Sequence, residues 1–212
     1  MLRASQTSLL NPLRLGDEVN FRLTYDGPLK AASQSDTRRV EKHAIRTAFN
    51  TQLNALYDSR KASFLDAELR EGEVAFPYVQ YGDFDFMALV REKLHLVCDL
   101  DILFLRRENP GQLVTGGGDL DNRIKVLFDA LRIPQDENEI RGLSPPPEPA
   151  PGPFFLCLAE DDKLITGFRI TTDRLLEPAK SPTEQNNVRL IINVEVKVTK
   201  LTPENMAYFS HF

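Results

Sequence analysis

The sequence predicts a single domain that spans residues 1–212. Its expected fold class is α/β, in the broad sense that includes α+β, with a mixed β-sheet flanked by helices. Three observations support this prediction. The chain is 212 residues long and 42% hydrophobic, which is enough for one sizeable core. Several segments alternate apolar and polar residues with the period of two that is typical of β-strands. Others repeat apolar residues every three or four positions, as amphipathic helices do.

The first predicted strand and the first predicted helix follow one another. Apolar and polar residues alternate from Val19 to Tyr25, and residues 26–28 (Asp-Gly-Pro) end this strand with a turn. A helix is expected next, because Asp36 or Thr37 can cap it and apolar residues recur along one side up to about residue 57.

The polar side of this helix holds a candidate nucleic-acid-binding surface. Its basic residues are Arg38, Arg39, Lys42 and Arg46. Spacings of three and four positions place such side chains next to one another on a helix. Two interpretations remain open, a solvated helix face and a surface that contacts DNA phosphates. The net charge of −5 argues against a protein that coats nucleic acid through its overall field, so any such contact must be local.

Two further strands are predicted with a single apolar face each. Residues 94–104 place apolar side chains at every second position, and residues 188–198 do the same. Asp99 and Asp101 lie on the opposite face of the first of these strands, where solvent exposure is expected, although that face could border a polar site. Residues 59–85 show no clear period and are expected to be mostly loop.

A glycine turn at residues 116–118 precedes the most informative helix of the chain, predicted over residues 121–131. Its apolar residues recur at i, i+3, i+4 and i+7, and Asp121 and Lys125 form a row beside them, with Asp119 just ahead of the helix. One interpretation is a helix cap followed by an ordinary ion pair four residues apart. The other is half of a metal site.

An acidic cluster follows later, between two short apolar runs at residues 154–158 and 164–170. It contains Glu160, Asp161 and Asp162. A hairpin with an acidic turn is one interpretation. The other is a ligand-binding loop at the ends of two strands. Between this region and the helix of residues 121–131, residues 144–153 are rich in proline, which excludes helix interior and central strand and predicts a stiff surface loop.

Other kinds of site are disfavoured by composition. Cys98 and Cys157 lie in separate apolar runs and are expected to be buried strand residues. The three histidines are scattered, so catalysis is expected to depend on carboxylates. No apolar run is long enough to span a membrane, and residues 1–20 lack the regions of a secretory signal, so a cytoplasmic protein without membrane contact is expected.

The helix at residues 121–131 and its surroundings resemble a known family. Residues 119–122 (Asp-Leu-Asp-Asn), Lys125 and residues 129–131 (Asp-Ala-Leu) are similar to the signature of RusA-type Holliday junction resolvases. Residues 160–165 resemble the family's second acidic element, which leads into a strand. The resemblance covers the chain from about residue 19 to residue 198. It implies a RusA-like fold, a homodimer, and Mg²⁺-dependent cleavage of branched DNA such as Holliday junctions in recombination and repair, with Mn²⁺ as a possible substitute.

The resemblance also implies roles for individual residues. Asp119, Asp121 and Asp162 would be catalytic carboxylates that bind the metal, Asp161 a further metal ligand, and Lys125 the catalytic lysine. Hard divalent cations prefer oxygen ligands and can supply both a nucleophilic water and charge neutralisation. Lys125 could place its ammonium group against the scissile phosphate or the leaving oxygen.

The chain departs from the family pattern in two ways. Residues 132–153 form an apparent insertion before the second acidic element, and an alternative alignment would use Asp136 and Glu137 instead. Asp161 and Asp162 are preferred because their flanking residues are strand-like. The second departure is the acidic net charge. Together with the proline-rich segment, it favours the alternative function of a RusA-like DNA-binding or assembly module without nuclease activity.

Overall fold

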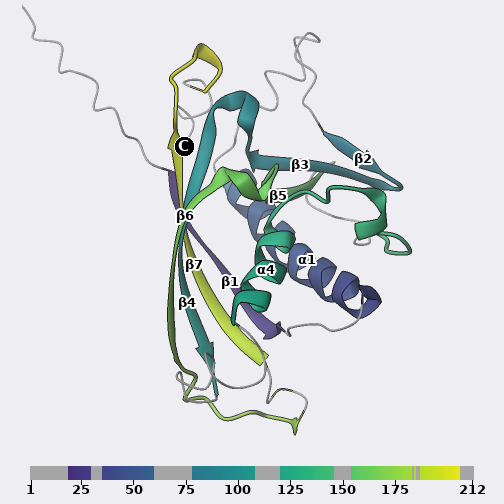
Figure 1. Ribbon diagram of the computed structural model, residues 1–212, viewed down its shortest axis with the longest axis vertical. Helices are drawn as coiled ribbons and strands as arrows, with labels where there is room; N and C mark the ends of the chain where they lie inside the picture. Colours follow the sequence, from purple (N-terminus) through teal and green to yellow (C-terminus); the bar gives the residue numbers. More distant parts are fainter. Residues whose placement is uncertain are drawn as a thin grey trace, which may run out of the picture.

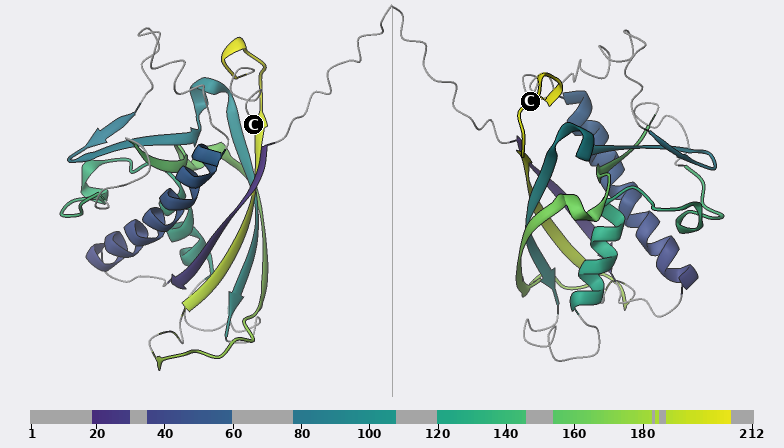
Figure 2. Two further views of the ribbon diagram at one scale, coloured as in Figure 1. Left: turned by 180° about the vertical axis from the view of Figure 1, so that it is seen from behind. Right: turned by 45° about the horizontal axis from the view of Figure 1, so that its top comes forward.

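The computed structural model describes residues 19–29, 35–59, 78–107, 120–145, 154–182, 184 and 187–205. The fold belongs to the α+β class, as the sequence predicts, and contains one four-stranded and one three-stranded β-sheet (Figure 1). Both long helices lie on the same side of the four-stranded sheet (Figure 2). We call that side of the sheet its inner face and the opposite side its outer face.

The four-stranded sheet has the order β1-β7-β4-β6. Its strands are β1 (Val19–Pro28), β4 (Leu96–Arg106), β6 (Ile165–Arg174) and β7 (Asn187–Val198). β7 is antiparallel to both neighbours, whereas β4 and β6 are parallel, so the sheet is mixed. The alternation in β4 and β7 produces the inner face, because every second side chain there is buried in the main core. The strands expected at residues 19–25, 94–104 and 188–198 are therefore confirmed, with shifts of a few residues.

The three-stranded sheet has the order β2-β3-β5 and contains β2 (Val79–Tyr81), β3 (Phe84–Val90) and β5 (Phe155–Ala159). Residues 59–85 are expected to be mostly loop. This expectation is wrong for β2 and the start of β3, and residues 60–77 lie outside the described residues. β2 is too short to show a period. β3 is buried on both faces, so its sequence does not alternate.

β5 and β6 do not form the hairpin that the sequence suggests. They belong to different sheets, and each pairs in parallel with another strand, β5 with β3 and β6 with β4. The last of the acidic residues between them begins a short 3-10 helix, η3 (Asp162–Leu164), at the point where the chain passes from one sheet to the other, and Asp161 is its N-cap. Local sequence cannot separate these two arrangements, because the same turn residues suit both.

The two long helices are α1 (Ser35–Ser59) and α4 (Leu120–Leu131), both close to their predicted bounds. Two further 3-10 helices are η1 (Glu92–Leu94) and η2 (Glu137–Glu139). α1 packs against α4, β5 and β1, and both helices cover the main core. Among the helices that the structure describes, none is long and apolar enough to cross a membrane. Cys98 and Cys157 are buried free thiols, as expected.

The first part of the predicted insertion is an integral part of the fold. Arg132 forms a parallel β-bridge with Ala159, and Ile133 and Ile140 are buried in a second apolar cluster with β3 and β5. Residues 132–145 therefore help to close the smaller core and include η2, and whether they are an insertion relative to the RusA-type pattern stays a prediction. Residues 146–153, which hold most of the prolines, lie outside the described residues.

His43 links α1 to this second core and should make stability depend on pH. Its ring packs against Phe84 and Phe155, and burial together with the nearby Arg46 lowers its pKa from the usual 6.5. The unfolded chain thus binds the proton more readily, so this contribution to stability is complete above about pH 6.5 and is lost as the pH falls below it. Titration of this one group can change the free energy of unfolding by at most about 1.4 kcal/mol per pH unit.

The measurement is urea unfolding between pH 7.5 and 5 for the wild type and His43→Phe, which keeps an aromatic ring and does not titrate. We expect the variant to lose less stability than the wild type over this range. Parallel pH profiles for the two proteins would contradict the prediction, since carboxylates elsewhere titrate equally in both.

Candidate functional site

The residues of the predicted signature that can be located lie on α4. Asp121 is in its first turn and Lys125 follows one turn later, and both side chains are exposed. Neither forms an ion pair or hydrogen bond with any residue in the described part of the chain. The ion pair four residues apart that the sequence offers as an alternative, between Asp121 and Lys125, is therefore not formed. Asp119 lies outside the described residues.

The start of α4 is held in place by a neighbour on the buried side of the same turn. Arg123 is 9% exposed, and its guanidinium donates a hydrogen bond to the carbonyl of Leu29, just after β1. Ile124 and Leu127 pack into the main core beside it. The buried side of α4 therefore determines which way Asp121 and Lys125 point, and they point away from the core.

The C-terminal part of α4 belongs to a buried ion cluster, which we define as Lys42, Arg46, Asp129, Arg132 and Glu139. Glu139 is its centre: its carboxylate lies 2.9 Å from Arg132, 3.3 Å from Lys42 and 3.5 Å from Arg46. Asp129 lies 3.2 Å from Arg132 and 3.4 Å from Lys42. The Arg46 guanidinium also donates to the Asp129 carbonyl at 2.8 Å. The cluster joins α1, α4 and η2.

This cluster corrects the prediction for α1. Lys42 and Arg46 do not form an exposed basic surface, because Arg46 is only 1% exposed and both side chains are paired inside the protein. Arg38 and Arg39 are half-buried. The predicted phosphate contact therefore loses two of its four residues. Their partner, Glu139, is almost one hundred positions away in the chain, so spacing along the helix could not indicate it.

The electrostatics of the cluster favour ionised groups. Burial tends to raise the pKa of Glu139, but the charges of Arg132 and Lys42 outweigh it and lower the pKa below its usual value. Burial likewise tends to lower the pKa of Arg132, and Glu139 reverses this effect. The five groups carry three positive and two negative charges, so each carboxylate is needed to compensate buried cations.

The two candidate acidic pairs have the same local structure. Asp161 caps η3 by accepting a hydrogen bond from the Lys163 amide at 2.9 Å, and Asp162 follows it as an exposed side chain. Asp136 caps η2 by accepting from the Asn138 amide at 2.8 Å, and the next residue is again an exposed carboxylate, Glu137. In each pair one carboxylate caps a short helix and the other is exposed. The charge of Asp162 also contributes to the raised pKa of Arg132.

The structure places both pairs toward the end of α4 that lies away from Asp121. η3 packs against α4, and η2 is tied to its last turn through Glu139 and Arg132. Within the described ranges, no three His, Cys, Asp or Glu side chains come close enough to hold a metal ion. Since Asp119 is outside those ranges, the predicted metal site stays a prediction.

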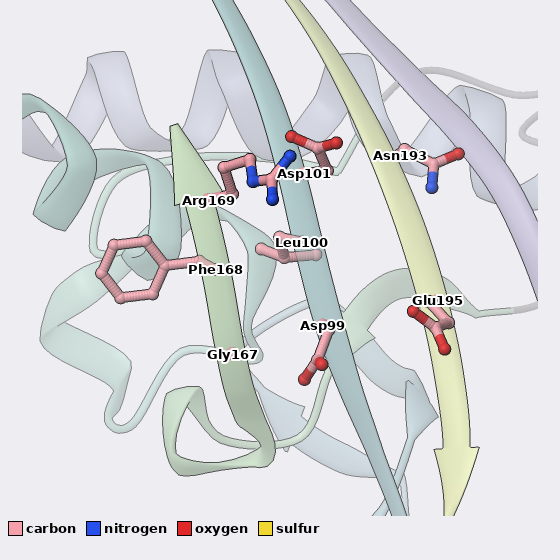
Figure 3. A pocket seen from close by; sticks show the side chains of 8 residues that line it. All are labelled: Asp99, Leu100, Asp101, Gly167, Phe168, Arg169, Asn193 and Glu195. Carbon is pink, nitrogen blue, oxygen red and sulfur yellow. The ribbon is translucent and has the colours of Figure 1, made fainter. Parts of the chain in front are cut away.

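The outer face holds a hollow of about 400 Å³ (Figure 3). It lies on the face of β4 that, from the sequence, could border a polar site. Asp99, Asp101 and Glu195 contribute carboxylates to it. Asp99 accepts hydrogen bonds from Lys197 at 2.6 Å and Thr166 at 2.9 Å, and Lys197 is the larger cause of its lowered pKa.

A close approach of two strands makes this arrangement possible. A Cβ atom on Gly167 would lie 2.9 Å from the Asp99 carboxyl group, so glycine leaves the space into which that group fits. Lys197 also pairs with Glu195 at 3.4 Å. Asp99, Glu195 and Lys197 thus neutralise one another across neighbouring strands, which indicates a stabilising network. Asp101 is exposed, as expected.

Comparisons with known proteins found no matching family model, no similar curated protein and no similar solved structure. The resemblance to RusA-type resolvases therefore rests on the signature residues alone.

Proposed function

We propose that this protein is a Mg²⁺-dependent endonuclease that cleaves branched DNA such as four-way junctions. The observation that carries the proposal is the exposed, partner-free state of Asp121 and Lys125 among the described residues, directly after Asp119. The other acidic residue of α4, Asp129, is committed to the buried ion cluster. A carboxylate and an ammonium group that pair with no described residue remain available for a ligand.

The donor set suits a hard divalent cation. The resemblance assigns Mg²⁺ to the oxygen atoms of Asp119, Asp121 and Asp162, with Asp161 less available because it caps η3. Asp162 follows β5 near the end of α4 that lies away from Asp121, so Asp121, with Asp119 two positions before it, is the part of this donor set that the start of α4 supports. Mg²⁺ would supply charge neutralisation and an activated water when bound. Lys125, one turn from Asp121, would place its positive charge against the scissile phosphate. A homodimer and a cytoplasmic location belong to the same proposal.

A second candidate is a DNA-binding or assembly module that lacks nuclease activity. The net charge of −5 favours it, because an acidic chain must bind DNA through small local surfaces. The burial of Lys42 and Arg46 favours it further, since both positive charges are already compensated inside the protein.

The test is incubation of the full-length protein with a synthetic four-way junction and with linear duplexes of the same arm sequences. We expect nicks near the branch point in Mg²⁺, no nicks in EDTA, restoration by Mn²⁺, and no cleavage of the linear duplexes. EDTA removes the cation that the carboxylates would hold, so the loss should be complete.

A matched binding measurement by gel shift in EDTA separates the two candidates. Junction binding without nicking in either Mg²⁺ or Mn²⁺, at protein concentrations above the Kd, would support the binding module and contradict the nuclease. Absence of both binding and nicking would contradict the nuclease and the DNA-binding module, and it would leave only the assembly module.

A further inference from the structure

A phenylalanine stands exposed at the edge of the four-stranded sheet. Phe168 in β6 is 58% exposed, whereas most large apolar side chains of the sheet are buried. β6 is the last strand in the sheet order, so its outer edge pairs with no strand in the described part of the chain. Strand formation does not require an aromatic residue here, since Thr166, Thr171 and Thr172 occupy other positions of β6.

The Phe168 ring points toward α4 and not toward the outer face. Its ring centre lies 5.2 Å from that of Phe128, with the planes at 81°, and we call these two residues the aromatic pair. Figure 3 shows Phe168 directed away from the outer-face hollow, while Arg169 extends over β4 toward Asp101. The aromatic pair therefore bridges the free edge of the sheet and α4.

The aromatic pair lies on the same side of α4 as the candidate site. Asp121, Lys125 and Phe128 are at positions i, i+4 and i+7, which share one side of a helix. With a rise of about 1.5 Å per residue, Phe128 is about 4.5 Å along the axis from Lys125 and about 10 Å from Asp121. At about 3.4 Å per nucleotide in a stacked strand, the second distance corresponds to about three nucleotides.

We propose that Phe168, supported by Phe128, is a stacking platform for an unpaired base of the DNA whose backbone phosphate is held by Lys125, beside Asp121 on α4. This inference rests on the proposed function and adds how branched DNA would be distinguished from duplex. Bases at a branch point can leave the stack and lie on an aromatic ring, whereas paired bases inside a duplex cannot. Stacking is tolerant of sequence, because every base has a π face.

Exposure and chemistry favour a base over a bound peptide side chain. A half-exposed aromatic ring gains from contact with any flat apolar surface. Lys125, three positions before Phe128 on α4, carries the opposite charge to a phosphate. Among the described residues of α4, no other lysine or arginine is exposed. A flat ring and a positive charge on one side of α4 match a nucleotide, which offers a base and a phosphate.

The experiment measures DNA binding by the full-length protein in EDTA, which removes the metal ion and so prevents metal-dependent cleavage. The probe is a four-way junction with 2-aminopurine at the branch point, and a linear duplex serves as the reference. Three variants at one exposed position separate the effects: Phe168→Ala removes the side chain, Phe168→Leu keeps its apolar contact with Phe128, and Phe168→Tyr keeps the aromatic face. Leu176→Ala, at an 84% exposed apolar residue in another part of the surface, is the matched control.

We expect Phe168→Ala and Phe168→Leu to weaken junction binding by about 5- to 150-fold, the range expected for one base stacked on an aromatic ring. Phe168→Tyr and Leu176→Ala should bind within about twofold of the wild type. Quenching of 2-aminopurine fluorescence should occur with the wild type and Phe168→Tyr and disappear with the other two Phe168 variants. Duplex affinity should not change in any variant.

Three results would overturn the proposal. Wild-type binding by Phe168→Leu would show that only apolar contact matters. A change in subunit assembly of Phe168→Ala, measured by sedimentation, would make the aromatic pair a protein contact. No junction binding by the wild type would remove both this inference and the proposed function. Junction binding that depends on Phe168 in a protein that never cleaves DNA would retain the platform and reject the nuclease, so the two failures are distinguishable.

Discussion

Replacing Glu139 by alanine is expected to lower the free energy of unfolding by about 3 kcal/mol, the lower end of the cost of breaking a buried ion pair. The Glu139 carboxylate is 15% exposed and contacts Arg132, Lys42 and Arg46. Without it, three buried cations would face Asp129 alone. Urea unfolding followed by circular dichroism at pH 7 measures the effect.

Two further variants separate charge from packing. Glu139→Gln keeps the size and one oxygen acceptor, so its loss should be smaller than that of Glu139→Ala and due mainly to charge. The double variant Glu139→Ala with Arg132→Ala should be less destabilised than the sum of the single variants, by about 0.5–3 kcal/mol. Additive effects would show that the two side chains do not interact in solution.

The pH dependence of this contribution has a defined sign. The pKa of Glu139 is lowered in the folded protein, so its stabilisation is present above the usual value of 4.5 and is lost as the pH falls through the folded pKa. The loss due to Glu139 begins below about pH 4.5 and the loss due to His43 already below about pH 6.5, so comparing Glu139→Gln with His43→Phe assigns each contribution. If Glu139→Gln and the wild type lost the same free energy of unfolding as the pH falls below 4.5, the role assigned to the cluster would be contradicted.

Sequence periodicity predicts strands and helices well where one face is buried. β4 and β7 alternate strictly because each separates the main core from the outer face. α4 repeats apolar residues every three or four positions for the same reason. β3 was not predictable in this way, because both of its faces are covered and its pattern is continuous.

Long-range pairing is the part that sequence could not reveal. The acidic segment before β6 has the residues of a hairpin turn, yet it leads from one sheet to another because β5 and β6 each pair with a distant strand. Asp99 meets Lys197 only through the register of β4 and β7, almost one hundred positions apart. Neither fact follows from local propensity.

The candidate site was partly predictable for the same physical reasons. The period of α4 correctly indicates that Asp121 and Lys125 point away from the core. On α1 the same argument treats charge as a sign of exposure, and it fails for Arg46 because Glu139 compensates the charge inside the protein. A buried cation is recognisable only together with its partner. The aromatic pair likewise depends on the packing of β6 against α4.

The Asp121→Asn variant is expected to reduce metal-dependent junction cleavage more than about 100-fold, because loss of a direct ligand should exceed the 10- to 100-fold cost of losing an outer-shell partner. Its melting temperature should not change, since the Asp121 carboxylate is exposed and has no partner among the described residues. Asparagine keeps the shape and removes the negative charge that Mg²⁺ requires. Initial cleavage rates and thermal unfolding of the same preparations measure both quantities.

Asp129→Asn provides the matched control, because it makes the same chemical change two turns later on α4. Asp129 is committed to Lys42 and Arg132, so this variant should lower the melting temperature and retain cleavage at temperatures where it is folded. The opposite responses of two carboxylates on one helix would separate a ligand from a structural ion pair. If Asp121→Asn instead loses stability together with activity, Asp121 is a structural cap of α4, and the metal site must be sought elsewhere.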